Sequence, residues 1–418
     1  MQKKQTASSI FNIVLLILAG EAVFVLPFVL ARIFRPTFLD VFSINNTELG
    51  SCFSVYGVVA FASYVFGGPL ADKYKPNLLM AVALWLTALG GFFLASYPSV
   101  IALHLLYGFW GFTTIFLFWA AMIKATRIWG GANHQGRAFG FLDGGRGLTA
   151  ALFGTLGLLL FATFFSTPNT ADKQLAFKHV IYATSILVAI IGCFVYFFLN
   201  SNTPSKNWTE TKHKLTFKDF KTLTRLPTVW LLMIIILCAY FGYKMTDVFS
   251  LYAKDVMAYN DIESAQIGTF LLYLRPIIGF VIGMLADKTK ASLWLIIGFI
   301  CMLVTSLVFS TAVINSQETF LFLLSISIMA LGVYAARVLY FATFNQANIP
   351  MALTGTAVGF ISLVGYTPDI FAGPLIGLLL DGSPGPLGHR HLFMVMALIS
   401  GIGLCAALWF HKISARKT

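Results

Sequence analysis

Charged side chains stand inside the long apolar stretches of this 418-residue sequence, and they are the residues best placed to do chemistry. A charge at the centre of a bilayer costs about 2.5 to 3.5 kcal/mol on insertion scales, so each one needs a partner or a polar cavity. Such residues can bind small ions and exchange protons. They are Glu21, Asp143, Arg146, Lys244, Asp247, Arg275, Arg337 and Asp369, with Lys124 near the end of its apolar run.

Four of these residues form two oppositely charged pairs with a spacing of three, which places both partners on one helix face. The pairs are Asp143 with Arg146 and Lys244 with Asp247. Two interpretations stay open for them, because a pair can neutralise itself within its own helix or can line a cavity.

Glu21 and Arg275 have no oppositely charged residue within one helical turn. An isolated carboxyl in a low-dielectric cavity can take up and release a proton, so Glu21 is a candidate for proton coupling, as are Asp369 and Asp143. The alternative for Glu21 is a buried salt bridge with an arginine or lysine. Arg275 must find its partner on another helix or in a ligand.

The cations indicate the charge of a ligand. Arginine binds carboxylate or phosphate through two parallel N–H donors. Arg337 also lies among tyrosines in the sequence, although it could instead cap a neighbouring helix end. We expect a small anionic or zwitterionic substrate, bound by Arg275, Arg337, Arg146, Lys124, Lys244 and Tyr340.

The composition is that of an integral membrane protein, with 58% hydrophobic and 11% charged residues and a mean hydropathy of +0.83. Apolar runs of roughly 20 residues can cross a bilayer as helices, which satisfy their own backbone hydrogen bonds. We count twelve, beginning near Ile10, Glu48, Leu78, Val100, Ala138, His179, Val229, Ser264, Ser292, Thr319, Ala352 and His391.

The basic residues between the runs predict the topology. Seventeen Lys and Arg residues fall on the side of both termini and the long middle loop, against five on the other side. The positive-inside rule therefore places both termini in the cytoplasm, with the chain in a bacterial inner membrane. No segment outside the runs is long enough for a domain that reads nucleic acid, so we expect no nucleic-acid partner.

The chain repeats itself. The pattern Gly-x-Leu-Ala-Asp-Lys-x-Lys begins at Gly68 and again at Gly283, 215 residues later, and residues 136–141 are echoed at 355–360. Internal repeats in an apolar chain are typical of secondary transporters. We predict two bundles, 1–199 and 228–418, joined by a cytoplasmic linker over 200–227.

The repeated pattern resembles the loop signature of the major facilitator superfamily at Gly68, Asp72 and Lys73, although residues 74–77 depart from the usual Gly-Arg-Arg. The resemblance implies an all-α fold of twelve transmembrane helices in two pseudo-symmetric six-helix bundles. It also implies cytoplasmic gating by the two copies of the loop, at Asp72, Lys73, Asp287 and Lys288. Residues 135–146 and 365–371 resemble a poorly characterised bacterial branch near the organophosphate and nitrate transporters.

Glycine and proline predict close packing or kinks in three of the runs. Small residues allow close helix packing in membranes, which we expect at Gly140, Gly144, Gly145, Gly147, Gly355, Gly359 and Gly365. Pro276, Pro368 and Pro374 should kink their helices, with Asp369 at an irregular position after Pro368.

These features favour a monomeric, proton-coupled symporter without a cofactor. The five cysteines show no metal or redox spacing, and the sequence contains no nucleotide-binding loop or nucleophile with a base, which argues against an enzyme. The alternatives are an exchanger of organic phosphate for phosphate, a multidrug/proton antiporter, and a sensor or channel that binds without cycling.

Overall fold

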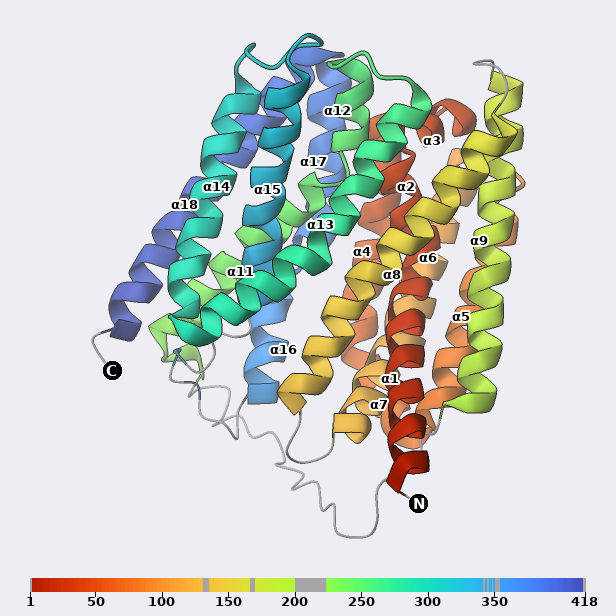
Figure 1. The fold of residues 1–418 in the computed structure, drawn as a ribbon, viewed down its shortest axis with the longest axis vertical. Coiled ribbons are helices and arrows are strands. Elements are labelled where there is room, and N and C mark those ends of the chain that lie inside the picture. Colours follow the sequence, from red (N-terminus) through yellow and green to blue (C-terminus); the bar gives the residue numbers. More distant parts are fainter. Residues whose placement is uncertain are drawn as a thin grey trace. The chain divides into compact units, whose positions relative to one another are not determined.

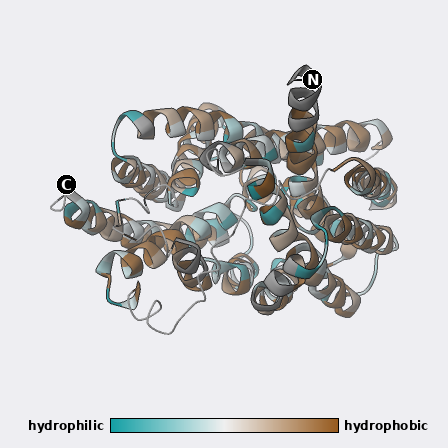
Figure 2. Ribbon diagram, turned by 90° about the horizontal axis from the view of Figure 1, so that it is seen from below, coloured by the Kyte–Doolittle hydropathy of each residue, from teal (hydrophilic) through white to brown (hydrophobic). Residues whose placement is uncertain are grey.

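The computed structural model describes residues 2–130, 135–165, 170–199, 223–340, 343, 346–347, 349 and 354–415. Within these ranges every regular element is a helix (Figure 1). Eleven of them are long and apolar enough to cross a membrane. Apolar residues colour most of their length in Figure 2.

The first half of the sequence supplies the six expected helical runs. The run from Glu48 is a 28-residue helix, and several of its side chains near the C-terminal end lie outside those that the structure describes. The elements are α1 (Gln2–Phe24), η1 (Val25–Val29), α2 (Leu30–Ile33), α3 (Arg35–Phe42), α4 (Asn46–Lys73), α5 (Pro76–Leu94), α6 (Val100–Gly111), η2 (Phe112–Trp119), α7 (Ala120–Gly130), α8 (Gln135–Phe164) and α9 (Thr170–Phe198).

The second half supplies the other six expected runs. A break follows the first of them, after Met245, and another divides the fifth into two helices, between Gly365 and Pro368. The elements are α11 (Pro227–Met245), α12 (Phe249–Asp255), α13 (Asp261–Lys288), α14 (Ala291–Ser310), α15 (Thr319–Leu339), α16 (Thr354–Gly365), α17 (Pro368–Gly382) and α18 (Pro386–Ala415). The predicted all-α fold is confirmed.

The duplication is visible in the way two helices begin. At the start of α4, the Asn45 side chain accepts from the Glu48 backbone N–H at 2.8 Å, and the Glu48 carboxylate accepts from the Asn45 N–H at 2.9 Å. Asn260 and Glu263 make the same two bonds at α13. The two capping boxes are 215 residues apart, the spacing of the repeated loops.

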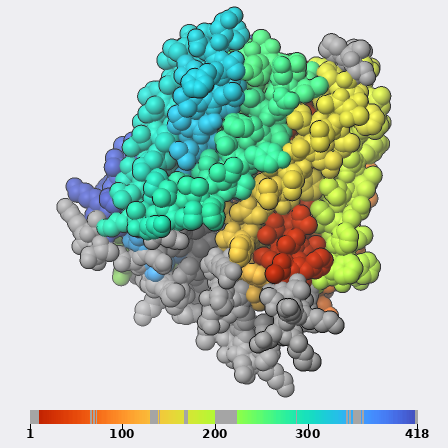
Figure 3. Space-filling model, in the orientation of Figure 1, coloured from red at the N-terminus to blue at the C-terminus, as the bar shows by residue number. Residues whose placement is uncertain are grey.

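The chain divides into two compact units. Unit 1 comprises Met1–Trp208 with Tyr259–Pro276, and unit 2 comprises Thr209–Ala258 with Ile277–Thr418, so the boundary runs through α13. In unit 1, α1 packs against α8 and α9, and Figure 3 shows the red residues of α1 between these two helices. In unit 2, α14 packs against α15 and α18, and α11 against α16 and α18. The sequence-based division into bundles and linker stays a prediction.

Three glycines pack closely, as predicted. A β-carbon added at Gly145 would lie 2.6 Å from Ile17, and one at Gly365 would lie 2.5 Å from Ile236. Gly147 has comparably close neighbours, which belong to the candidate site below. The contacts join α8 to α1, and α16 to α11.

The prediction of close packing is wrong for Gly140 and Gly144, because an added β-carbon there would meet nothing within 4 Å. Both lie on a side of α8 that faces away from its neighbours, which the count of glycines along a helix does not reveal. Gly355 and Gly359 lie outside the residues whose side chains the structure describes.

Candidate functional site

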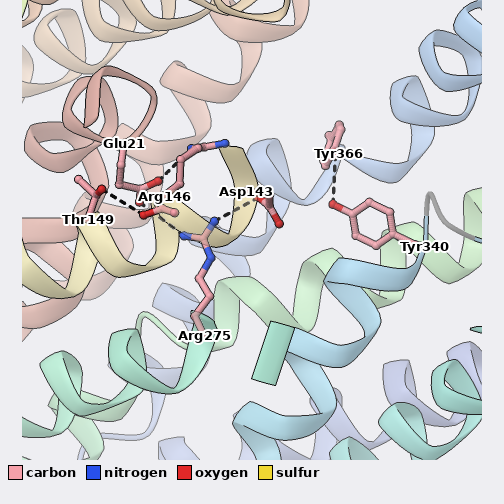
Figure 4. A network of polar contacts seen from close by, with 8 residues as sticks. Glu21, Asp143, Arg146, Thr149, Arg275, Tyr340 and Tyr366 are labelled. Carbon is pink, nitrogen blue, oxygen red and sulfur yellow. Dashed lines mark hydrogen bonds and ion pairs between the residues drawn. The ribbon is translucent and has the colours of Figure 1, made fainter. Parts of the chain in front are cut away.

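Glu21 on α1 is the centre of a buried ionic cluster in unit 1 (Figure 4). Arg146 Nε, from α8, donates to Glu21 Oε2 at 3.1 Å, and Arg275 Nη1, from α13, lies 3.5 Å from Glu21 Oε1. Both carboxylate oxygens therefore face a guanidinium group. Of the two roles expected for Glu21, the buried salt bridge is present.

A second carboxylate completes this cluster. Asp143 Oδ1 lies 3.5 Å from Arg275 Nη2, and its side chain is 45% exposed, whereas Glu21, Arg146 and Arg275 are each at least 92% buried. Arg275 thus finds its partners on other helices, as expected. Arg146 pairs across helices with Glu21, so the spacing of three between Asp143 and Arg146 did not reveal its partner. Two acids and two arginines leave the cluster formally neutral.

Two aromatic rings enclose the Arg146 guanidinium. Its central carbon lies 5.4 Å from the Phe24 ring and 5.8 Å from the Trp119 ring, distances at which cations are attracted to π faces. Phe24 directly precedes the π-helical segment η1, and Trp119 ends the π-helical segment η2. Such segments often occur at functional sites. Neither π-helical segment was predicted from the sequence, and Pro27 inside η1 was the available signal.

Glycines make room for the two arginines. An added β-carbon at Gly20 would lie 3.3 Å from Arg146 Cδ, and one at Gly147 would lie 3.2 Å from both Arg275 Cγ and Pro276 Cδ. The aliphatic stems therefore cross their neighbouring helices where no side chain is in the way. This close approach brings the guanidinium groups to Glu21.

Unit 2 contains a second buried ion pair. Lys244 Nζ lies 2.6 Å from Asp369 Oδ1, and the Tyr240 hydroxyl donates to the two Asp369 oxygens at 2.9 and 3.1 Å. Lys244 is in the last turn of α11 and Asp369 in the first turn of α17. Each charge has the sign that its own helix end favours. Asp369 thus lies at an interruption, as Pro368 predicted.

Tyrosines surround this pair and Arg337. The Arg337 guanidinium stacks 3.8 Å from the centre of the Tyr243 ring, and the hydroxyls of Tyr340 and Tyr366 lie 3.2 Å apart (Figure 4). The Tyr240 ring meets Tyr366 edge to face at 4.8 Å. The aromatic setting of Arg337 is confirmed. Tyr240 was not predicted as a site residue, although its spacing of four from Lys244 placed both on the same helix face.

Lys124 is on α7 and contacts the end of α4. Its ammonium donates to the Ala71 carbonyl at 2.7 Å, close in sequence to the repeated loop. Its role in substrate binding stays a prediction.

The gating residues are described in part. Lys73 and Lys288 are exposed, and Lys73 Nζ lies 5.6 Å from the centre of the Tyr74 ring. The side chains of Asp72 and Asp287 lie outside those that the structure describes. The gate stays a prediction.

Comparison with known proteins identifies the class. The family model described as Major Facilitator Superfamily matches residues 7–371. The chain belongs to this superfamily, which makes it a multi-pass membrane transporter rather than an enzyme.

Particular relatives and solved structures agree with this assignment. The chain is 26% identical over 378 residues to Inner membrane protein YqcE of Escherichia coli K12, covering 88% of this chain and 87% of that protein. It is 25% identical over 409 residues to Inner membrane protein YihN of the same organism, covering 96% of each.

Two solved structures share the fold. A D-xylose-proton symporter superposes with a TM-score of 0.76 at 14% identity, over 96% of this chain and 97% of that one. A bacterial homologue of the human lysosomal transporter Spinster, inward-facing and unoccupied, gives 0.75 at 15% identity, over 98% and 97%. The resemblance to the branch near organophosphate and nitrate transporters stays a prediction.

Proposed function

We propose that this transporter is a proton-coupled symporter of a small anionic or zwitterionic metabolite, in a bacterial inner membrane with both termini in the cytoplasm. The observation that carries the proposal is one buried carboxylate, Glu21, shared by two buried arginines, Arg146 and Arg275. The E. coli relatives are inner membrane proteins by name, which supports the location.

The shared carboxylate couples a proton to an anion. While Glu21 is ionised, Glu21 and Asp143 balance the two guanidinium charges. A proton on Glu21 leaves two buried cations facing one half-exposed carboxylate, and a buried charge without a partner costs several kcal/mol. An anionic substrate group would offset that cost. By linkage, the bound anion favours the proton as much as the proton favours the anion.

The site residues take separate parts in this cycle. Arg146 and Arg275 would bind the anionic group, and Glu21 would carry the coupling proton, with Asp143 as the more exposed counter-charge. We extend substrate binding to the predicted residues of unit 2, Lys244, Arg337 and Tyr340. Alternating access of two bundles, gated at the repeated loops, would complete transport.

The first experiment finds the anion. The purified protein is screened for thermal stabilisation by monocarboxylates, sugar acids, sugar phosphates, amino acids and inorganic phosphate. Arg275→Ala should weaken binding of the stabilising compound roughly tenfold or more, because a charge-assisted hydrogen bond contributes about 1.5 to 3 kcal/mol. Arg275→Lys should recover part of it, keeping the charge but losing the planar fork. Wild-type affinity in Arg275→Ala would contradict this site.

The second experiment tests coupling with the compound so identified. Proteoliposomes with an alkaline interior should accumulate it, and Glu21→Gln should abolish accumulation while substrate exchange across the membrane continues. Asp40→Asn is the matched control, since Asp40 pairs with Lys173 in the same unit and is 42% exposed. Accumulation that persists in Glu21→Gln would favour the anion exchanger instead.

A further inference from the structure

The buried ion pairs of the two units have opposite polarity. In unit 1 the acid, Glu21, is on α1 and the base, Arg146, is on α8. In unit 2 the base, Lys244, is on α11 and the acid, Asp369, is on α17. The internal repeat equates α1 with α11, and α8 with the α16–α17 run. In each half an ion pair thus joins the first and fifth runs. The first run carries the acid in unit 1 and the base in unit 2.

The unit 2 pair lies where two helices stop. After Lys244, α11 ends at Met245, and α17 begins at Pro368, one residue before Asp369. Broken helices are typical of the coupling sites of transporters, because their free ends respond to charge. Loss of the charge on Asp369 would remove both the ion pair and the favourable contact with its helix end.

The groups around Asp369 come from several helices. Its nearest donors are Lys244 and Tyr240 of α11, and Tyr366 contacts the Tyr240 ring. Arg337 of α15 contacts the ring of Tyr243, and Tyr340, which directly follows α15, contacts the hydroxyl of Tyr366 in the same aromatic network. The helix α18 also packs against α17, and its ionisable residues stand at its beginning or beyond its middle: His389, Arg390, His391, Cys405, His411 and Lys412.

We propose that Asp369 is a second proton-binding group of this transporter, independent of Glu21, and that Tyr240 is its positioning residue. The proton adds to a carboxylate oxygen of Asp369, while Lys244 keeps all three of its protons and loses its ion pair with Asp369. An anionic group can then take the place of Asp369 beside Lys244. The inference deepens the proposed symport, because each half carries its own proton and the cycle can move two.

Protons alone are a sufficient probe. Infrared difference spectra of the full chain in lipid nanodiscs, recorded between alkaline and acidic pH, report the carbonyl stretch of each newly protonated carboxyl. Wild type should show a band that Asp369→Asn removes and Glu21→Gln retains, and a second band with the opposite behaviour. Asp40→Asn is the matched control and should retain both, since Asp40 pairs with Lys173 and contacts neither Glu21 nor Asp369 in the structure.

The outcomes separate this inference from the proposed function. If Asp369→Asn leaves the spectrum unchanged while Glu21→Gln removes a band, Asp369 does not bind the proton and the coupling role of Glu21 stands. The reverse result would support Asp369 and contradict Glu21. Should Asp369→Asn fail to fold, aspartate-specific ¹³C labelling of wild type must still shift the band that Glu21→Gln retains. An unshifted band would overturn the inference.

Tyr240 is tested by the frequency of the same band. Tyr240→Phe keeps the ring and removes the hydroxyl that bonds both oxygens of Asp369. The Asp369 band should move to higher frequency, because its carboxyl loses a hydrogen bond, and the Glu21 band should not move. Tyr273→Phe is the control, since the Tyr273 hydroxyl bonds Thr155 in unit 1. An unmoved Asp369 band in Tyr240→Phe would contradict the positioning role.

Discussion

At the scale of single residues, burial makes the ionic contacts of Glu21 energetically important. Its side chain is 4% exposed and faces two guanidinium groups, one of which is also enclosed by aromatic rings. Taking these charges out of water costs several kcal/mol each, and only their mutual attraction offsets it. The same arrangement that stabilises the fold therefore responds strongly to the loss of one charge.

Removing one partner of this pair should be costly. Arg146→Ala leaves Glu21 with the more distant Arg275, and we expect a loss of about 3 to 5 kcal/mol, as for other broken buried pairs. The double variant Glu21→Ala with Arg146→Ala should lose less than the sum of the single variants. Denaturant unfolding in detergent measures both.

The ion pair between Lys173 and Asp40 supplies the comparison. Asp40→Asn should cost less than about 1 kcal/mol, because the Asp40 side chain is 42% exposed and Lys173 keeps its second partner, Asp261. Equal losses in Arg146→Ala and Asp40→Asn, or strict additivity in the double variant, would show that the Glu21 pair is not energetically coupled.

The sequence identified most charged residues of the site but not their partners. Hydropathy marks a charge that stands in an apolar run, and such residues are costly wherever they lie. Partners are a matter of three-dimensional packing: Arg146 meets Glu21 across 125 residues, whereas spacing along a helix indicates only neighbours within a turn. Tyr240, which bonds Asp369, carries no charge and was missed for that reason.

At the scale of helices, a glycine allows close packing only where it lies on the face of its helix that meets a neighbour. Gly147 and Gly144 are one turn apart on α8, yet only Gly147 has a neighbour, the stem of Arg275 beside Pro276. Hydropathy predicted the twelve helical runs because apolar length is what a bilayer selects. Hydropathy did not predict the π-helical segments η1 and η2 or the break after α11. A change in the backbone hydrogen bonds of one helical turn leaves the mean hydropathy of the run unchanged.

The two glycines make a matched pair of variants. Gly147→Ala should destabilise by about 1 to 3 kcal/mol, because the new methyl group would press on Arg275 and Pro276. Gly144→Ala should be neutral or stabilising by roughly 0.5 to 1 kcal/mol, since alanine loses less backbone entropy in a helix. Thermal unfolding midpoints compare them. If both variants lose the same stability, α8 does not pack here as the structure shows.

At the scale of the whole molecule, the basic residues predict an orientation that the fold alone does not give. The prediction is specific to each loop. Ser99 and Asn315 are exposed and lie in loops expected outside, whereas Lys75 and Lys290 are exposed and lie in loops expected in the cytoplasm.

Single cysteines at these four positions test the topology in a cysteine-free background. A membrane-impermeant maleimide should label Ser99→Cys and Asn315→Cys in intact cells, and Lys75→Cys and Lys290→Cys only after permeabilisation. The positive-inside rule supplies the physical reason. The inverse pattern would reverse the assigned orientation, and with it the direction of the proton gradient used in transport.

The division of α13 between the two units has a mechanical consequence. Its residues up to Pro276 group with unit 1 and those from Ile277 with unit 2, although the helix is continuous from Asp261 to Lys288. Proline donates no backbone hydrogen bond to the preceding turn of the helix. The helix α13 is therefore easiest to bend at the boundary between the two units. Pro276 directly follows Arg275, which is anchored to Glu21 and Asp143. A bend of α13 at Pro276 would therefore move the backbone next to Arg275, and with it the distances from its guanidinium to Glu21 and Asp143.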